Sequence, residues 1–173
     1  MTLEGDIARR FEWVHGHADV WRLFSDGDLL RRVAAALADP FRDATKVAGI
    51  EARGFILGGA VAAELGAGFA AIRKEDGLFP GAKVERRAEA DYRENEQVLR
   101  LQRAAVVPSD RVVLVDDWAE RGSQALAARA LIEECGATFA GLSIIVDQLE
   151  DGVRERIGRV CALVSHEALG PSS

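Results

Sequence analysis

The sequence predicts an α/β fold in which a parallel sheet of about five strands is flanked by helices. Apolar runs such as Val112–Val115 contain no polar residue, which is typical of strands buried on both faces. Segments with the apolar spacing of helices lie between these runs, as expected for right-handed parallel connections. With 173 residues, the chain fits a single domain over residues 1–173.

The expected elements follow one another along the chain. Short apolar runs predict strands at 46–50, 68–72, 112–115, 140–146 and 160–164. Helical spacing of apolar residues predicts helices at 28–38, at 54–65 and after residue 123, with Gly66 and Gly136 just past the ends of the last two. The stretch 75–108 is polar and charge-rich, and Lys83–Tyr92 and Gln97–Arg103 are the expected arms of a hairpin projecting from the body.

Composition narrows the classes of partner. The formal net charge of −6 argues against binding to nucleic acid or to a membrane surface. No stretch approaches the roughly 18 apolar residues of a membrane span. Cys135 and Cys161 are isolated and lack metal-ligand spacing, so we expect buried thiols and a cytoplasmic protein.

The segment Val112–Gln124 carries the clearest chemical signal. Its apolar strand runs straight into Asp116 and Asp117, and open α/β sheets bind ligands where their strands end. The following turn places backbone N–H groups at the start of a helix, which suits an anion. Two carboxylates suit the hydroxyls of ribose, so the segment predicts a ribose-phosphate site. A strand-terminal Asp pair that only caps the next loop is the alternative.

On these residues the chain resembles the type I phosphoribosyltransferases, and within them the adenine phosphoribosyltransferase branch. Three blocks carry the resemblance, at Gly49–Phe55, Ala71–Gly81 and Val113–Ser123. It implies a transferase of nucleotide salvage that moves 5-phosphoribosyl from phosphoribosyl diphosphate (PRPP) to a nitrogenous base, with adenine as the first candidate, and releases diphosphate. It also implies Mg²⁺ as cofactor, held mostly by diphosphate oxygens and water, with Asp116 and Asp117 as further ligand candidates.

The resemblance assigns the chemistry at the anomeric carbon and the diphosphate. Asp116 and Asp117 would hold the ribose hydroxyls and favour an oxocarbenium-like transition state, because fixed carboxylates stabilise its positive charge. The residues that would hold diphosphate are Glu51, Ala52, Arg53, Arg73 and Lys74. A non-proline cis peptide bond is implied between Glu51 and Ala52. Surface exposure of the Arg-Lys pair is the alternative.

The 5′-phosphate loop departs from the family pattern. The usual Ala-Thr-Gly-Gly-Thr is replaced by Glu120, Arg121, Gly122, Ser123 and Gln124. Both threonine hydroxyls are lost, and Glu120 adds a negative charge beside a dianion. Arg121 either pairs with the phosphate or pairs with Glu120 at the surface, and the sequence leaves both open.

The resemblance also implies a hood, a lid and a partner subunit. Residues 1–27 would form a small N-terminal hood over the base, where Trp21 is the expected base contact, together with Leu149 from the body. Trp13, Phe24, His15 and His17 are further hood candidates, and simple packing of the hood aromatics onto the body is the alternative. Residues 75–108 would form a flexible lid hairpin in which Asp91 handles a proton on the base; a solvated hairpin tip is the competing interpretation. A homodimer is expected, since the family pairs diphosphate residues across subunits.

Two other functions remain compatible with the sequence. The altered phosphate loop is compatible with a non-catalytic regulatory protein that binds PRPP or a nucleotide. The divergent hood is compatible with a phosphoribosyltransferase that uses a non-purine acceptor.

Overall fold

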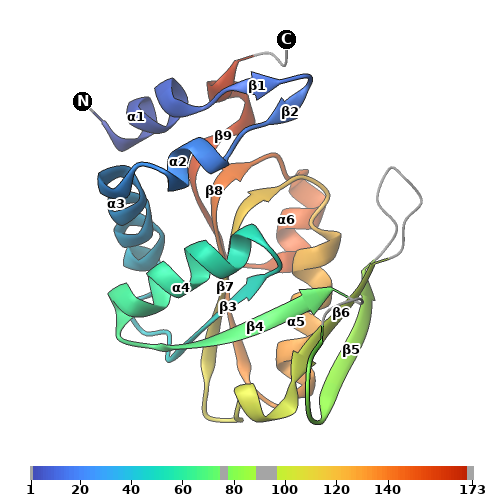
Figure 1. Ribbon diagram of the computed structural model, residues 1–173. Coiled ribbons are helices and arrows are strands. Elements are labelled where there is room, and N and C mark those ends of the chain that lie inside the picture. Colours follow the sequence, from blue (N-terminus) through green and yellow to red (C-terminus); the bar gives the residue numbers. More distant parts are fainter. Residues whose placement is uncertain (1, 75–77, 89–96, 171–173) are drawn as a thin grey trace.

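The computed structural model describes residues 2–74, 78–88 and 97–170. They form a seven-stranded sheet with helices on both faces and a small N-terminal unit at one end (Figure 1). The strands are β3 (Lys46–Ile50), β4 (Gly68–Lys74), β5 (Lys83–Ala88), β6 (Gln97–Gln102), β7 (Arg111–Ala119), β8 (Thr138–Asp147) and β9 (Val160–Ser165). The helices that flank them are α3 (Gly27–Ala38), α4 (Arg53–Leu65), α5 (Ser123–Glu134) and α6 (Asp151–Ile157).

The predicted α/β class is confirmed, and the five predicted strands form the parallel part of the sheet. The strand order is β5-β6-β4-β3-β7-β8-β9, with β4, β3, β7, β8 and β9 parallel. Strands β3 and β7 lie side by side at the centre, with Gly49 opposite Val115. The loops after these two strands therefore meet at the same edge of the sheet.

The sheet has seven strands rather than about five, because the expected hairpin joins it. Strand β6 pairs antiparallel with β4, and β5 pairs with β6. Leu99 and Leu101 are completely buried, and Val84 is nearly so. These alternating apolar residues pack in the same core cluster as α5, so the described arms extend the sheet instead of projecting from it.

Two apolar cores flank the sheet. One lies beneath α5 and α6 and contains residues such as Leu114, Leu131 and Ile144. The other lies beneath α3 and α4 and contains Val113, Val115 and Leu57. Because side chains alternate along a strand, successive residues of β7 pack into opposite cores.

The N-terminal unit packs on the second core. It consists of α1 (Leu3–Arg10), the short hairpin β1 (Trp13–Val14) with β2 (His17–Ala18), and α2 (Trp21–Phe24). Ile7, Val20 and Leu23 are fully or almost fully buried there. Figure 1 shows this unit beside the C-terminal strand β9, above the carboxyl end of β8. The short helices η1 (Asp39–Phe41), η2 (Arg103–Ala105) and η3 (His166–Leu169) complete the described structure, in which no helix is long and apolar enough to cross a membrane.

Candidate active site

A pocket of about 810 Å³ lies between the carboxyl ends of the central strands and the N-terminal unit. It brings together most of the predicted site residues, from several separate parts of the chain. The predicted site residues that line it are Glu51, Ala52, Arg53, Lys74, Asp116, Asp117, Glu120, Arg121, Gly122, Ser123, Gln124 and Trp21. The three sequence blocks therefore converge on one cavity.

The Asp pair lies within strand β7, not after it. Strand β7 continues to Ala119, so Asp116 and Asp117 occupy alternate faces near its carboxyl end. Asp117 is 3% exposed, whereas Asp116 is half-buried. The Asp117 amide donates a 2.9 Å hydrogen bond to Asp116 Oδ1. Burial and the negative charge of Asp117 raise the pKa of Asp116 well above its usual range.

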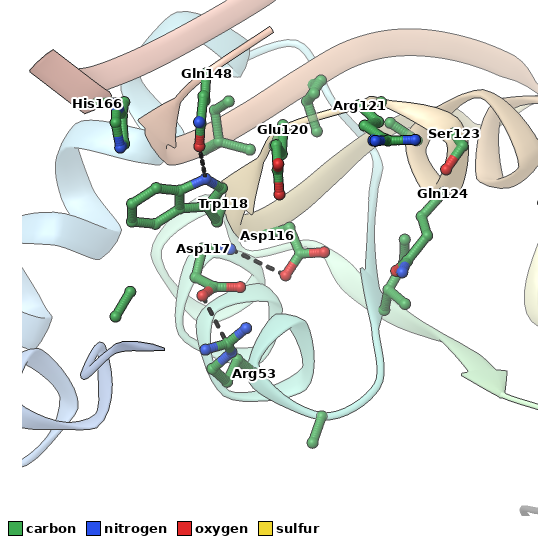
Figure 2. A pocket seen from close by; sticks show the side chains of 18 of the residues that line it. Arg53, Asp116, Asp117, Trp118, Glu120, Arg121, Ser123, Gln124, Gln148 and His166 are labelled. Atoms are coloured by element: carbon green, nitrogen blue, oxygen red, sulfur yellow. Dashed lines mark hydrogen bonds and ion pairs between the residues drawn. The ribbon is translucent and has the colours of Figure 1, made fainter. Parts of the chain in front are cut away.

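Asp117 is neutralised by the first residue of helix α4. Arg53 Nε lies 3.0 Å from Asp117 Oδ2, and Figure 2 shows the two side chains directed toward each other. The turn that carries Arg53 packs closely on β7. A Cβ at Gly54 would lie 3.1 Å from the Val115 carbonyl oxygen and 3.2 Å from Asp116 Oδ1, so glycine allows this approach. The Glu51–Ala52 peptide bond before it is cis, as the resemblance implied.

Glu51 and Arg73 form a second ion pair beside the pocket. Arg73 Nη2 lies 3.0 Å from Glu51 Oε1 and Arg73 Nε 3.3 Å from Glu51 Oε2, while the Lys74 amide donates to Glu51 Oε2 at 3.0 Å. These donors lower the pKa of Glu51. Arg73 Nη1 donates to the Leu78 carbonyl oxygen at 2.7 Å. Lys74 lines the pocket, but Arg73 does not, because Glu51 and Leu78 hold its guanidinium outside.

The predicted phosphate loop forms the start of helix α5. Gly122 has φ +66° and precedes Ser123, the first helical residue, and no side chain caps the helix. A Cβ at Gly122 would lie 2.5 Å from Val153 Cγ1, so this backbone position requires glycine. Free N–H groups at a helix start bind anions, which agrees with the predicted position of the 5′-phosphate.

The polar side chains of this loop differ in their settings. Gln124 Nε2 donates to Gln97 Oε1 at 3.0 Å, which links the loop to strand β6. Glu120 is exposed and points into the pocket (Figure 2). Arg121 lies on the same wall and also interacts within the protein. The loop thus offers backbone donors and a cation, together with a carboxylate that opposes a dianion.

The predicted base contacts have different outcomes. Trp21 lines the pocket, is 50% exposed and packs edge-on against Phe24. Leu149 does not line it, because its side chain lies behind the loop, where a Cβ at Gly122 would meet Leu149 Cδ2 at 3.0 Å. Asp91 lies outside the described residues. Trp13 and His17 do line the pocket.

Sequence reasoning missed Trp118, Gln148 and His166, all of which line the pocket. Trp118 Nε1 donates to Gln148 Oε1 at 2.9 Å, and the His166 ring centroid lies 5.7 Å from that of Trp118. A bulky aromatic residue directly after the Asp pair was the available signal for Trp118. Gln148 and His166 come from the ends of neighbouring strands, and no local pattern marks them.

The fold is that of an α/β protein with a parallel sheet, and its pocket at the carboxyl ends of the strands suits an anionic, hydroxyl-bearing ligand. A phosphoribosyl transferase domain model matches residues 23–162. Adenine phosphoribosyltransferase of Jannaschia sp. (strain CCS1) is 40% identical over 141 residues, covering 80% of this chain and 77% of the relative. That of Maricaulis maris is 38% identical over 155 residues, covering 86% and 87%. The chain belongs to the phosphoribosyl transferase family of enzymes.

Solved structures agree with this assignment. Adenine phosphoribosyltransferase from Rhodothermus marinus superposes with a TM-score of 0.83 at 28% identity, covering 94% of this chain and 98% of that one. The enzyme from Giardia lamblia, complexed with 9-deazaadenine, gives a TM-score of 0.85 at 26% identity, covering 96% and 99%. The resemblance to the adenine branch is therefore confirmed by sequence and by fold.

Proposed function

We propose that the protein transfers 5-phosphoribosyl from PRPP to a purine base, with adenine as the first candidate, and releases diphosphate in a Mg²⁺-dependent reaction. The observation that carries this proposal is the convergence of the Asp pair, the Glu51–Arg53 turn and the 120–124 loop on one pocket. The relatives named as adenine phosphoribosyltransferases support adenine as the acceptor.

Each part of PRPP has a complementary wall. The 5′-phosphate would meet the N–H groups at the start of α5, and the ribose hydroxyls would meet Asp116. Diphosphate would lie against Lys74 and the amides of the Ala52–Arg53 turn. Asp117, held by Arg53, would keep a negative charge below the ribose. The carboxylates would then stabilise positive charge at the anomeric carbon as its bond to diphosphate breaks.

Magnesium would enter this site bound to the diphosphate of PRPP. Among the described residues, no three His, Cys, Asp or Glu side chains come together as a metal site. Mg²⁺ prefers oxygen ligands and retains water, so diphosphate oxygens would hold most of its coordination sphere, with Asp116 and Asp117 as further candidate ligands from the pocket. When bound, it would neutralise charge on the leaving diphosphate.

We also propose a homodimer in the cytoplasm. Arg73 is held outside its own pocket, and the exposed apolar residues Ile56 and Phe69 lie on neighbouring elements, α4 and β4. Both cysteines are free thiols, which suits a reducing compartment. Light scattering after size-exclusion chromatography tests the dimer, and a monomer at micromolar concentration would contradict it.

The Glu120 carboxylate favours a second candidate, a protein that binds PRPP without turnover. Its negative charge lies in the loop that would hold the 5′-phosphate, and it would weaken binding of a dianion. Diphosphate release from PRPP with Mg²⁺ and a panel of purine and non-purine bases separates the candidates. We expect release that depends on adenine. Release with only a non-purine base would change the acceptor, and PRPP binding without release with any base would support the second candidate.

A further inference from the structure

One end of the pocket is aromatic. All three tryptophans of the chain, Trp13, Trp21 and Trp118, line the pocket, together with His17 and His166. These five residues, which we call the aromatic end, come from the N-terminal unit, strand β7 and the start of η3. The groups that suit the two phosphate ends of PRPP lie on other elements, namely the 51–53 turn, the end of β4 and the 120–124 loop, and the Asp pair directly precedes Trp118 on β7. The aromatic end is therefore the part of the cavity that suits a planar acceptor.

Trp118 is fixed in this end by several contacts. Its indole Nε1 donates to Gln148 Oε1 at 2.9 Å. Its ring lies edge-on to His166, with centroids 5.7 Å apart, and edge-on to Trp13, with centroids 5.9 Å apart. Figure 2 shows Gln148 and His166 beside the Trp118 ring, and Asp117 is the preceding residue of β7. The indole is therefore held in one orientation next to the reaction centre.

The hydrogen bond to Trp118 also fixes the amide of Gln148. An indole N–H only donates, so the side-chain oxygen of Gln148 must face it and the NH₂ group must face the other way. Within the described residues, no group accepts a hydrogen bond from this NH₂. Gln148 Nε2 is also not one of the buried polar atoms without a hydrogen-bond partner, so it is not sealed inside the protein. Since Gln148 lines the pocket, its NH₂ group is a hydrogen-bond donor for whatever binds there.

We propose that Trp118 and Gln148 together select the acceptor base. Trp118 packs against the planar ring, and the NH₂ group of Gln148 donates to a lone pair on the edge of that ring. The site then prefers a base with a ring nitrogen or an exocyclic oxygen at that edge over the same ring with C–H there. This inference rests on the proposed function, because it assumes that the acceptor occupies the aromatic end.

Ring analogues test the inference without turnover. Calorimetry would measure binding of adenine and of deaza analogues, each with one ring nitrogen replaced by C–H, in the presence of ribose 5-phosphate. One analogue should bind the wild-type protein about five- to tenfold more weakly than adenine, which is about 1.0–1.4 kcal/mol and matches the net contribution of one hydrogen bond. The inference is contradicted if every analogue binds as well as adenine, or if adenine itself does not bind.

Variants of the pair identify the donor. In Gln148→Leu, which removes the amide, the analogue that binds weakly should come within about twofold of adenine, because no donor remains to be left unpaired. In Trp118→Phe, which keeps an aromatic ring but frees the amide to rotate, the penalty should also fall. Gln102→Leu is the matched control, since Gln102 donates to the Pro80 carbonyl oxygen away from the pocket. An unchanged penalty in Gln148→Leu, with a melting temperature like that of the control, would overturn the assignment.

The inference and the proposed function fail separately. If the analogue penalty depends on Gln148 but no base supports diphosphate release, the acceptor site stands and the transfer reaction does not. If adenine supports release but the penalty is the same in Gln148→Leu, only the role of Gln148 is lost.

Discussion

The Arg53–Asp117 ion pair should contribute measurably to stability as well as to the site. Replacing Arg53 by Met keeps an unbranched side chain like the aliphatic part of arginine but removes the charged guanidinium. It leaves Asp117, whose side chain is 4% exposed, without its cation. A carboxylate left unpaired inside a protein is unfavourable, so Arg53→Met should lower the free energy of unfolding.

The structure sets the magnitude of this loss. Two unit charges 3.0 Å apart attract by about 5 kcal/mol at an effective dielectric constant of about 20, which is an upper limit. Water reaches Arg53, because its side chain is 38% exposed. A surface ion pair contributes about 0–1 kcal/mol, and breaking a buried pair costs about 3–5 kcal/mol. Because Asp117 is buried and Arg53 is partly exposed, we expect Arg53→Met to lower the free energy of unfolding by about 2–3 kcal/mol.

Thermal unfolding followed by circular dichroism measures the effect. For a chain of this size the melting temperature falls by about 2–4 °C per kcal/mol, so Arg53→Met should lower it by about 4–12 °C. Arg31→Met is the matched control, because Arg31 pairs with Asp28 and both side chains are largely exposed. In an Asp117→Asn background the effect of Arg53→Met should nearly vanish. A loss no greater than that of Arg31→Met, or an equal loss in the Asn background, would refute the reasoning.

Three further predictions concern the loop, the second ion pair and the Asp pair. Gly122→Ala should raise the KM for PRPP by at least about tenfold, because the new Cβ would collide with Val153 and Gly122 has φ +66°. Gly152→Ala is the control, since nothing lies within 4 Å of a Cβ at Gly152. Equal kinetics for the two variants would contradict this prediction. Glu51→Gln should lower the free energy of unfolding by about 1 kcal/mol near pH 7. The loss should shrink as the pH falls below the unfolded-state pKa and through the lowered folded-state pKa of Glu51, because a lowered pKa stabilises the fold only above that range. Chemical unfolding over a series of acidic pH values measures this, and a pH-independent loss would disprove it. Asp116→Asn should keep the hydrogen bond from the Asp117 amide and lose turnover in steady-state kinetics. It should also raise the melting temperature above about pH 5, because the raised pKa of Asp116 means that its ionised form disfavours folding at those pH values. A lower melting temperature would count against the assigned cause.

The convergence of the three sequence blocks was predictable because parallel topology dictates it. Loops after neighbouring parallel strands meet at one edge of the sheet, so Arg53 and Asp117 had to approach each other once β3 and β7 were adjacent. The buried strands themselves were visible as apolar runs. The extent of β7 was not, because Asp116 and Asp117 look like a strand end although the pairing with β8 continues to Ala119.

Other features depended on contacts that no local pattern encodes. The edge strand β5 has few apolar residues among many charges, and β6 is a short segment flanked by polar residues. Burial of Val84, Leu99 and Leu101 near α5 places the two strands in the sheet. The position of Arg73 outside the pocket follows from its bidentate pairing with Glu51, a partner from the neighbouring strand end. Spacing along the chain does not reveal such pairing.

The aromatic end was only partly predictable. The hood aromatics Trp13 and Trp21 were candidates because they are large planar residues in the expected hood. The pairing of Trp118 with Gln148 requires the register of β7 against β8, and the approach of His166 requires β9 beside β8. Register of this kind is set by packing of the whole sheet, so a single sequence does not specify it locally.

The central claim is that this pocket joins the phosphoribosyl group of PRPP to a base. Mass spectrometry of the products formed from PRPP, Mg²⁺ and isotopically labelled adenine tests it most directly. The wild-type protein should form a labelled nucleoside 5′-monophosphate with one diphosphate released for each molecule formed, and Asp116→Asn should form essentially none. Hydrolysis of PRPP to ribose 5-phosphate with the label remaining in free adenine would contradict the account.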